Sequence, residues 1–280
     1  MTFRLANIAG RAALVDGTDQ WHDLHRLTNG AVTADPMKAL RDPAALHRAA
    51  GRMERASPDG ALTTADLLSP VPFPRNCVAI GLNYHDHAAE SGATPPPNPL
   101  TFTKFPSCIV GPRANVELRS DTADYEVELV VVIGSPGRDI AAANAWSHVL
   151  GVTIGQDISD RVLQFASSPP HFDLGKSRDT YGPLGPTLAS VDSFADPDDI
   201  ALRCSVNGEP RQSSTTANLI FSVPQLIAYL SSVMTLGVGD IIFTGTPAGV
   251  GMTTKNWLRP GDVIESTIDG VGTMTNTCVA

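Results

Sequence analysis

DYEVELVVVIG, residues 124–134, is the stretch that decides the fold of this chain. Its apolar part, residues 127–134, is interrupted only by Glu128, which is typical of a strand buried on both faces of a sheet. Similar strands are predicted at 149–157 and 240–251, and the second of these leads into a Gly/Pro-rich loop. These strands do not alternate regularly with helices. The pattern therefore predicts an α+β chain that is mostly β, and it disfavours a doubly wound α/β sheet.

Turn and capping signals predict the elements around these strands. Asp269-Gly270 between two apolar stretches predicts a β-hairpin over residues 262–280. Asp42 followed by Pro43 is a good start for a short helix. Further helices are expected at 141–150 and 222–236. Gly and Pro number 24 and 22, which fits a chain with many turns.

The first 70 residues differ in texture from the rest of the chain. Residues 5–17, LANIAGRAALVDG, predict two short strands around a Gly turn. Residues 69–76, SPVPFPRN, hold three prolines and form the best candidate for a boundary. The sequence therefore predicts a small N-terminal α+β domain, 1–70, and a second domain, 71–280.

Composition excludes several classes of protein. The chain has 280 residues with 29 acidic and 20 basic ones, a net charge of −9 that repels nucleic acid and anionic lipid. The sequence has no G-x-G-x-x-G motif after a strand and no G-x-x-x-x-G-K-[ST] motif, so nucleotide binding has no support. The four cysteines fit no zinc pattern, and no export signal is evident, so we expect a cytoplasmic protein with reduced thiols. The uncharged stretch 212–239 is interrupted by polar residues, so we expect a buried helix there and no membrane span.

Three carboxylates are the candidates for a metal site. Glu126 and Glu128 are two positions apart on a strand, so both side chains point to the same face. Asp157 follows an apolar strand, where a rigid scaffold presents functional groups. A divalent cation would relieve the repulsion between such acids, and an all-oxygen donor set selects Mg²⁺, Mn²⁺ or Ca²⁺ over zinc. Taken singly, each residue also fits a solvated strand end or an ordinary turn.

Two further signals concern acid–base chemistry. Lys176 in a Gly-Ser turn is either a solvated loop charge or an anion contact beside a metal. His87 and Glu90 share one helical face if this segment is helical, so the pair is either a general base for water or a surface ion pair. The Gly and Pro residues that follow suggest that residues 85–100 form a lid.

Together and in this order, these segments resemble the fumarylacetoacetate hydrolase family. The resemblance covers about residues 75–279, and the N-terminal part is similar to the small accessory domain of bacterial members. The motifs that carry it are GLNYHDHAAE (81–90), FTKFPSCIVGP (102–112), DYEVELVVVIG (124–134), GQDISDRVLQ (155–164), LGKSRDTYGPLGP (174–186), VNGEPRQ (206–212), TLGVGDIIFTGTPAGVG (235–251) and LRPGDVIE (258–265).

The resemblance implies a mixed β-roll, an incomplete barrel with short helices, in a protein that pairs as a homodimer. It also implies one Mg²⁺ or Mn²⁺ ion and a small 2-oxo acid as substrate. The site residues that it implies are Glu126, Glu128 and Asp157 for the metal, His87 and Glu90 for water activation, Lys176 for substrate contact and catalysis, and Gln164 and Thr246 for substrate binding.

The implied activity is hydrolysis of a C–C bond in 2,4-dioxo acids, acylpyruvate-like or sugar-derived, as a step of catabolism. The same site suits oxaloacetate decarboxylation, or isomerisation and hydration of dienoates in aromatic catabolism, so these alternatives stay open. Arg178 stands where the family often has an aromatic residue; it would hold a second substrate carboxylate or pair with Asp179. Asp160 and Gln156 also depart from the family pattern.

Overall fold

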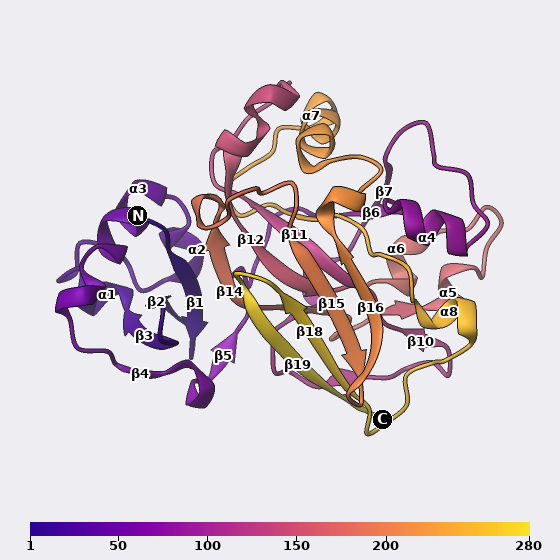
Figure 1. The fold of residues 1–280 in the computed structure, drawn as a ribbon, viewed down its shortest axis with the longest axis horizontal. Helices are drawn as coiled ribbons and strands as arrows, with labels where there is room; N and C mark the ends of the chain where they lie inside the picture. The colour runs from indigo at the N-terminus through magenta and orange to yellow at the C-terminus, as the bar shows by residue number, and fades with distance from the viewer.

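A twelve-stranded sheet runs through the computed structural model, which describes residues 1–280 (Figure 1). Ten of its strands follow one another in the order β4 (Gly60–Ala61), β3 (Gln20–Asp23), β2 (Arg11–Val15), β1 (Arg4–Ile8), β14 (Gly182–Ser190), β12 (Val149–Gln156), β11 (Val127–Ile133), β17 (Ile241–Phe243), β6 (Cys77–Gly81) and β7 (Leu100–Thr103). Two strands branch off, β5 (Leu67–Leu68) beside β1 and β8 (Ile109–Val110) beside β14. Within this sheet, only the pairs β17–β6 and β8–β14 are parallel.

A second sheet lies in front of β11, β12 and β14 in the view of Figure 1. Its strands are β16 (Glu209–Thr215), β15 (Ala201–Val206), β18 (Val263–Ile268), β19 (Gly272–Val279) and β9 (Val116–Glu117). A two-stranded ribbon is formed by β10 (Ala123–Asp124) and β13 (Ser159–Asp160). β18 and β19 turn at Asp269-Gly270, with φ +82° at Gly270, which confirms the predicted hairpin.

Strand β11 is buried along its whole length, as the sequence predicts. Its side chains alternate between two cores. Val127 and Leu129 join a cluster of 35 buried residues that includes side chains from the second sheet. Val130 and Val132 join a cluster of 20 on the opposite face, and Glu128 shares that face by period two. The mostly-β prediction is therefore confirmed.

Helices are short. The α-helices are α1 (Leu24–Leu27), α2 (Pro36–Ala39), α3 (Pro43–Ala50), α4 (His85–Glu90), α5 (Arg161–Gln164), α6 (Phe172–Gly175), α7 (Val223–Val233) and α8 (Gly251–Thr254). The 3-10 helices are η1 (Met53–Arg55), η2 (Leu62–Thr64), η3 (Pro106–Cys108), η4 (Ala142–His148), η5 (Val191–Ser193) and η6 (Thr216–Asn218).

The helix predictions are met in two cases and corrected in one. The Asp42 side chain caps α3 by accepting from the Ala45 amide, and α7 begins with the predicted capping box at Ser222 and Gln225. The segment 141–150 is not an α-helix. It forms the 3-10 helix η4, and its last two residues already belong to β12. No helix of the chain is long and apolar enough to cross a bilayer.

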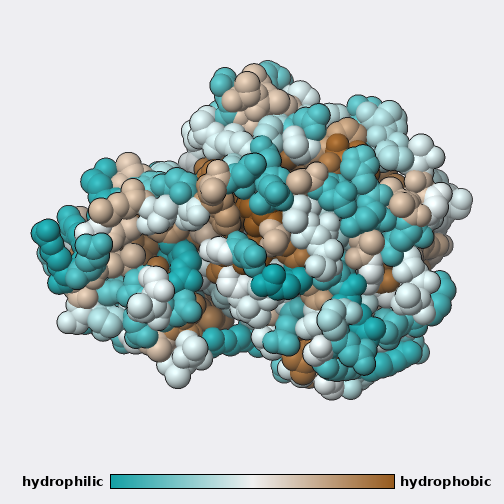
Figure 2. Space-filling model, in the orientation of Figure 1, coloured by the Kyte–Doolittle hydropathy of each residue, from teal (hydrophilic) through white to brown (hydrophobic).

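The N-terminal residues form a lobe that is joined to the large sheet. β1 and β2 make the predicted hairpin, and β1 also pairs with β14 through Arg4↔Ala189 and Leu5↔Leu188. In Figure 2 this lobe is separated from the larger body by a notch on the lower side, while the polar surface continues over both. The division into 1–70 and 71–280 stays a prediction.

The start of one strand and the ends of three others lie side by side along one border of the large sheet, where the strands terminate. β11 is antiparallel to β12 and β17, and β6 is parallel to β17, so the start of β11 lies beside the ends of the other three. The register Val127↔Gln156 continues past both strands, since the Asp157 amide donates to the Glu126 carbonyl oxygen at 2.9 Å. The residues that precede β11 and follow β12, β17 and β6 are thereby brought together.

Candidate active site

The three predicted carboxylates lie together at this edge. One oxygen from each of Glu126, Glu128 and Asp157 lies within 4.8 Å of the others. Their exposed fractions are 5%, 1% and 0%, so none is a solvated strand end. The two glutamates come from the start of β11 and the aspartate from the end of β12. The structure therefore brings together the residues predicted for a metal site.

Lys176 joins this cluster, as predicted. It caps the C-terminus of α6, and its Nζ atom lies 2.6 Å from Glu126 Oε2 and 2.7 Å from Asp157 Oδ2. The lysine is 3% exposed, which rules out a solvated loop charge. Its ammonium group bridges two of the three carboxylates.

Lys104 is a second buried lysine at the site, to which no role was assigned from the sequence. Its Nζ atom donates to Asp157 Oδ1 at 2.7 Å and to the carbonyl oxygens of Tyr181 and Lys176. Burial alone would lower the pKa of Lys104, but the Asp157 carboxylate outweighs this effect and raises it. The sequence signal for this role was a lysine between Phe102 and Phe105, directly after a strand. Without other sequences for comparison, such a lysine looks like an ordinary loop lysine.

Arg161 is a third cation that sequence reasoning did not assign. At the start of α5, its Nη2 atom lies 2.6 Å from Glu126 Oε1 and 2.7 Å from Asp124 Oδ2. Lys104, Asp157, Lys176, Glu126, Arg161 and Asp124 therefore form a buried chain of alternating charges.

Glu128 stands beside this chain without a cation of its own. Its Oε2 atom accepts one hydrogen bond, from the Gly245 amide at 2.7 Å. Burial, together with the nearby charges of Asp157 and Glu126, raises the pKa of Glu128 well above its usual range. For Glu126, burial acts in the same direction, but Lys176 and Arg161 prevail and lower its pKa to about 2.

This imbalance fits a divalent cation. A buried carboxylate that faces two others and lacks a counter-charge is costly, and a cation between the three would offset that cost. Three carboxylates form the oxygen donor set that Mg²⁺ and Mn²⁺ prefer. Glu126, Glu128 and Asp157 can therefore hold such an ion.

The predicted His87–Glu90 pair forms on α4. His87 Nδ1 lies 2.8 Å from Glu90 Oε1, and His87 is buried rather than part of a surface ion pair. Both Glu90 oxygens accept from the Gly249 amide at 3.1 Å. The glutamate occupies Nδ1, which leaves Nε2 as the nitrogen that can act on water.

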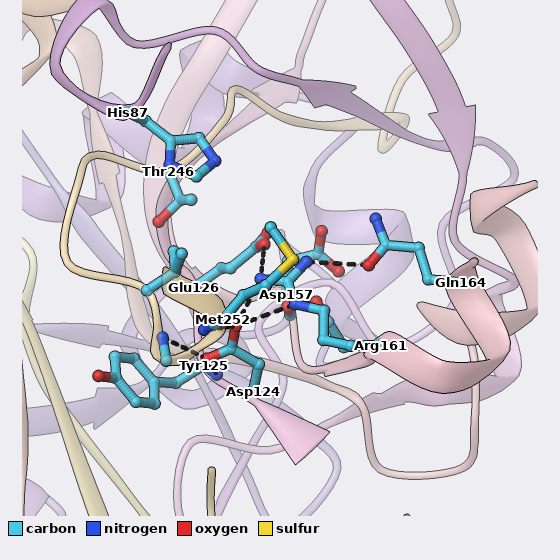
Figure 3. Close-up of polar contacts among 12 residues, drawn as sticks. His87, Asp124, Tyr125, Glu126, Asp157, Arg161, Gln164, Thr246 and Met252 are labelled. Atoms are coloured by element: carbon cyan, nitrogen blue, oxygen red, sulfur yellow. Dashed lines mark hydrogen bonds and ion pairs between the residues drawn. The ribbon is translucent and has the colours of Figure 1, made fainter. Parts of the chain in front are cut away.

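A cavity of about 280 Å³ joins the two groups of residues. Its polar lining contains His87, Ser91, Glu126, Glu128, Arg161, Gln164, Lys176 and Thr246. An apolar wall includes Phe102, Phe165 and Phe172, whose rings meet edge to face with centroids 5.6 and 5.9 Å apart. Figure 3 shows His87 and Thr246 on one side of the acidic cluster and Gln164 on the other.

Arg178, predicted to bind substrate, lies outside this lining. Its guanidinium pairs with Asp160 at 2.7 Å, while Asp179, the expected alternative partner, takes no part. Gln164 and Thr246 do line the cavity, but both are also held by the protein. Gln164 Oε1 accepts from Arg161, and the Thr246 hydroxyl donates to the Val127 carbonyl oxygen.

The loop after β17 connects the parts of the site through its backbone. The Gly245 amide donates to the Glu128 carboxylate, and the Gly249 amide donates to that of Glu90. The amides of residues 251 and 252 both donate to the Asp124 carboxylate. Gly249 has φ +102°, and a Cβ atom there would lie 2.0 Å from the Arg211 carbonyl oxygen. Only glycine fits this position, which explains the Gly-rich sequence of the loop.

The family profile described as fumarylacetoacetate (FAA) hydrolase C-terminal matches residues 76–279. A bovine protein, oxaloacetate tautomerase FAHD2A, mitochondrial, from Bos taurus, is 44% identical over 216 residues, which are 76% of this chain and 69% of the relative.

Two solved structures are similar over nearly the whole chain. A Mycobacterium smegmatis protein is 44% identical, with a TM-score of 0.91 and 99% of each chain covered. Maleylpyruvate hydrolase from Sphingobium sp. SYK-6, solved with manganese(II) and pyruvate, is 31% identical, with a TM-score of 0.83 and 99% of this chain and 98% of that one covered.

Proposed function

The chain belongs to the fumarylacetoacetate hydrolase family, and on this premise we propose that it is a divalent-metal-dependent hydrolase of 2,4-dioxo acids. It would cleave the C3–C4 bond and release pyruvate, or a related 2-oxo acid, together with a carboxylate. The observation that carries this proposal is that His87, held by Glu90, lines the same cavity as Glu126 and Glu128 of the acidic cluster.

The residues divide the reaction between them. A Mg²⁺ or Mn²⁺ ion held by Glu126, Glu128 and Asp157 would supply Lewis acidity for the negative charge that develops on the C2 oxygen. His87 Nε2 takes a proton from water as the water oxygen bonds to C4. Glu90 fixes the ring orientation and stabilises the imidazolium. The C3–C4 bonding pair passes into the enolate of the 2-oxo acid, and a proton then returns to C3.

Lys176 supports the same step. Its ammonium group lies in the cavity wall, where it can contact the 2-oxo or enolate oxygen of the substrate. A fixed cation in a site that excludes water stabilises developing charge more strongly than solvent does.

The apolar wall of the cavity favours a substrate whose substituent on C4 is uncharged. Both cations of the lining, Arg161 and Lys176, are already bonded to protein carboxylates. A second substrate carboxylate against Phe102, Phe165 or Phe172 would lose its hydration without gaining a partner. An acylpyruvate fits this wall better than a dicarboxylate does.

A second candidate is oxaloacetate chemistry, which the 44% identity with the bovine tautomerase favours. Keto–enol interconversion needs a proton transfer at C3, for which His87 would also serve. Decarboxylation of oxaloacetate uses the same electron sink and needs no attacking water. Isomerisation or hydration of dienoates stays open on the same chemical grounds.

A product-release assay separates C–C bond hydrolysis from decarboxylation. Acetylpyruvate, fumarylpyruvate, a 2,4-dioxo sugar acid and oxaloacetate are each incubated with Mg²⁺ or Mn²⁺, and pyruvate and CO₂ are read separately. We expect pyruvate without CO₂, with the highest kcat/KM for acetylpyruvate. If only oxaloacetate reacts, the second candidate replaces the first.

We also propose that residues 85–100 act as a lid. α4 is held to the loop after β17 by hydrogen bonds from Ala248 to Asp86 and from Gly249 to Glu90. Gly92 has φ +64°, which makes it a permissive hinge, and Pro95 to Pro97 form a stiff arm. Such an element would admit substrate and then exclude bulk water.

Hydrogen exchange tests the lid. Oxalate carries the two chelating oxygens of a pyruvate enolate, so exchange across 85–100 should slow when oxalate and Mg²⁺ are added together. Mg²⁺ alone should have no such effect, and α7, remote from the cavity lining, serves as the internal control. Unchanged exchange under saturating oxalate would contradict the lid while leaving the metal site standing.

The homodimer and the cytoplasmic location stay predictions, as does the role of residues 1–70 as an accessory domain. The bovine relative carries the word mitochondrial in its name.

A further inference from the structure

Asp124 is a fully buried carboxylate that takes no part in the steps above. It lies at the end of the alternating-charge chain, two residues before Glu126. Its Oδ2 atom accepts from Arg161 Nε at 2.9 Å, from Arg161 Nη2 at 2.7 Å and from the Met252 amide at 2.9 Å. Its Oδ1 atom accepts from the amides of Gly251 at 2.7 Å and Tyr125 at 2.9 Å. Figure 3 shows Asp124 and Arg161 together beneath Met252.

We propose that Asp124 is a positioning residue for the metal site, acting through Arg161. This inference rests on the proposed function, because it assumes a divalent cation at Glu126, Glu128 and Asp157. A single oxygen of Asp124, Oδ2, accepts from two nitrogens of the guanidinium, Nε and Nη2, and these two hydrogen bonds hold the orientation of the group. Arg161 then reaches Glu126 with one nitrogen and Gln164 with another.

Charge balance gives Asp124 its effect on a cation. Arg161 carries one positive charge that is shared between Asp124 and Glu126. If Asp124 were neutral, that charge would be balanced by Glu126 alone. Arg161 would then hold Glu126 more strongly and would repel a divalent cation at short range. Asp124 therefore keeps Glu126 available as a ligand.

Backbone contacts give Asp124 a second point of support. The Gly251 and Met252 amides belong to the first turn of α8, and Met252 lines the cavity. A Cβ atom on Gly251 would lie 2.6 Å from Asp124 Oδ1, so the approach of this backbone to the carboxylate requires glycine. Asp124 thus ties the cavity wall to the same arginine that contacts a metal-ligand candidate.

The first test compares Asp124→Asn with a matched control. Asp240→Asn alters a carboxylate that is also buried, 1% exposed, and that accepts from Arg75, Asn76 and the Gly237 amide outside the cavity lining. We expect Asp124→Asn to weaken Mn²⁺ binding by roughly 10–100-fold in calorimetry, the usual effect of losing an outer partner of a metal ligand. Asp240→Asn should lower the melting temperature comparably and leave Mn²⁺ affinity unchanged.

Arg161→Gln tests the direction of the change in Mn²⁺ affinity, and this test does not depend on the folding of the Asp124 variant. Removing this cation should tighten Mn²⁺ binding by roughly tenfold, since one repulsive charge is lost at short range. The double variant Asp124→Asn/Arg161→Gln restores the charge balance, so the two opposite effects should offset each other and leave Mn²⁺ binding within about tenfold of the wild-type protein.

The outcomes separate this inference from the proposed function. If the wild-type protein binds no Mn²⁺, the proposed metal dependence fails and the role of Asp124 falls with it. If the wild-type protein binds Mn²⁺ and Asp124→Asn binds it equally well, only the role of Asp124 is overturned. The role of Asp124 is also overturned if Arg161→Gln binds Mn²⁺ more weakly and the losses add in the double variant. Asp124 and Arg161 would then only support the structure.

Discussion

Glu128→Gln is expected to abolish metal binding and to lower C–C cleavage by roughly 10³-fold or more, because Lewis acidity contributes several kcal/mol to such a step. Glutamine keeps an oxygen for the Gly245 amide, so the local backbone contact survives. The same variant should unfold at a higher temperature than the wild-type protein when both are free of metal. The loss of metal binding and the gain in metal-free stability have the same origin, because Glu128 has no counter-charge other than the metal ion.

The pH dependence follows from the same shift. The folded-state pKa of Glu128 lies above its unfolded value, so the unfolded chain loses this proton first as pH rises. The metal-free wild-type protein should therefore lose stability as pH rises from the ordinary glutamate range towards the folded-state pKa, a loss that Glu128→Gln escapes. Thermal unfolding with EDTA and with Mn²⁺ measures both effects. Normal turnover of the variant in EDTA would show that the site is misassigned.

His87→Ala has the second large expected effect. Loss of the general base should reduce hydrolysis of a 2,4-dioxo acid by roughly 10²–10⁴-fold. Decarboxylation of oxaloacetate should fall much less, because no water attacks in that reaction. The ratio of the two activities in one protein preparation is the quantity to measure, since it is independent of the folded fraction.

The control for this prediction lies two residues away. His85 is on the same short helix but is exposed, so His85→Ala changes an imidazole without touching the cavity. We expect it to leave both activities near those of the wild-type protein. Equal losses of hydrolysis and decarboxylation in His87→Ala would mean that His87 positions the substrate or the lid and does not activate water.

The sequence was informative where a local period determines geometry. Period two along β11 predicted that Glu126 and Glu128 share a face, and the strand ends at Asp157 and after β17 follow from apolar runs. The hairpin at Asp269-Gly270 and the cap of α7 are equally local, and both are confirmed. The family pattern added His87, Glu90 and Lys176. The structure places His87 and Lys176 in the lining of one cavity and Glu90 against His87.

The rest depends on contacts between distant residues. Lys104 and Asp157 are 53 residues apart, and Arg161 and Asp124 are 37 apart, so no local pattern indicates either pair. Arg178 was expected to hold a substrate or to pair with its neighbour, but Asp160, 18 residues away, is its partner. Unlike the two glutamates of β11, these charged residues lie outside any periodic pattern. Their roles emerge only when the fold sets which charges are buried together.

Isotope labelling of the product tests the central claim most directly. Acetylpyruvate is incubated with the protein and Mn²⁺ in H₂¹⁸O, and the acetate is analysed by mass spectrometry. If a metal-dependent hydrolysis takes place at this site, acetate and pyruvate form in equal amounts, the acetate carries one ¹⁸O, and EDTA or Glu128→Gln stops the reaction. The account is contradicted if saturating Mn²⁺ yields no labelled acetate while the same protein accelerates the keto–enol interconversion of oxaloacetate.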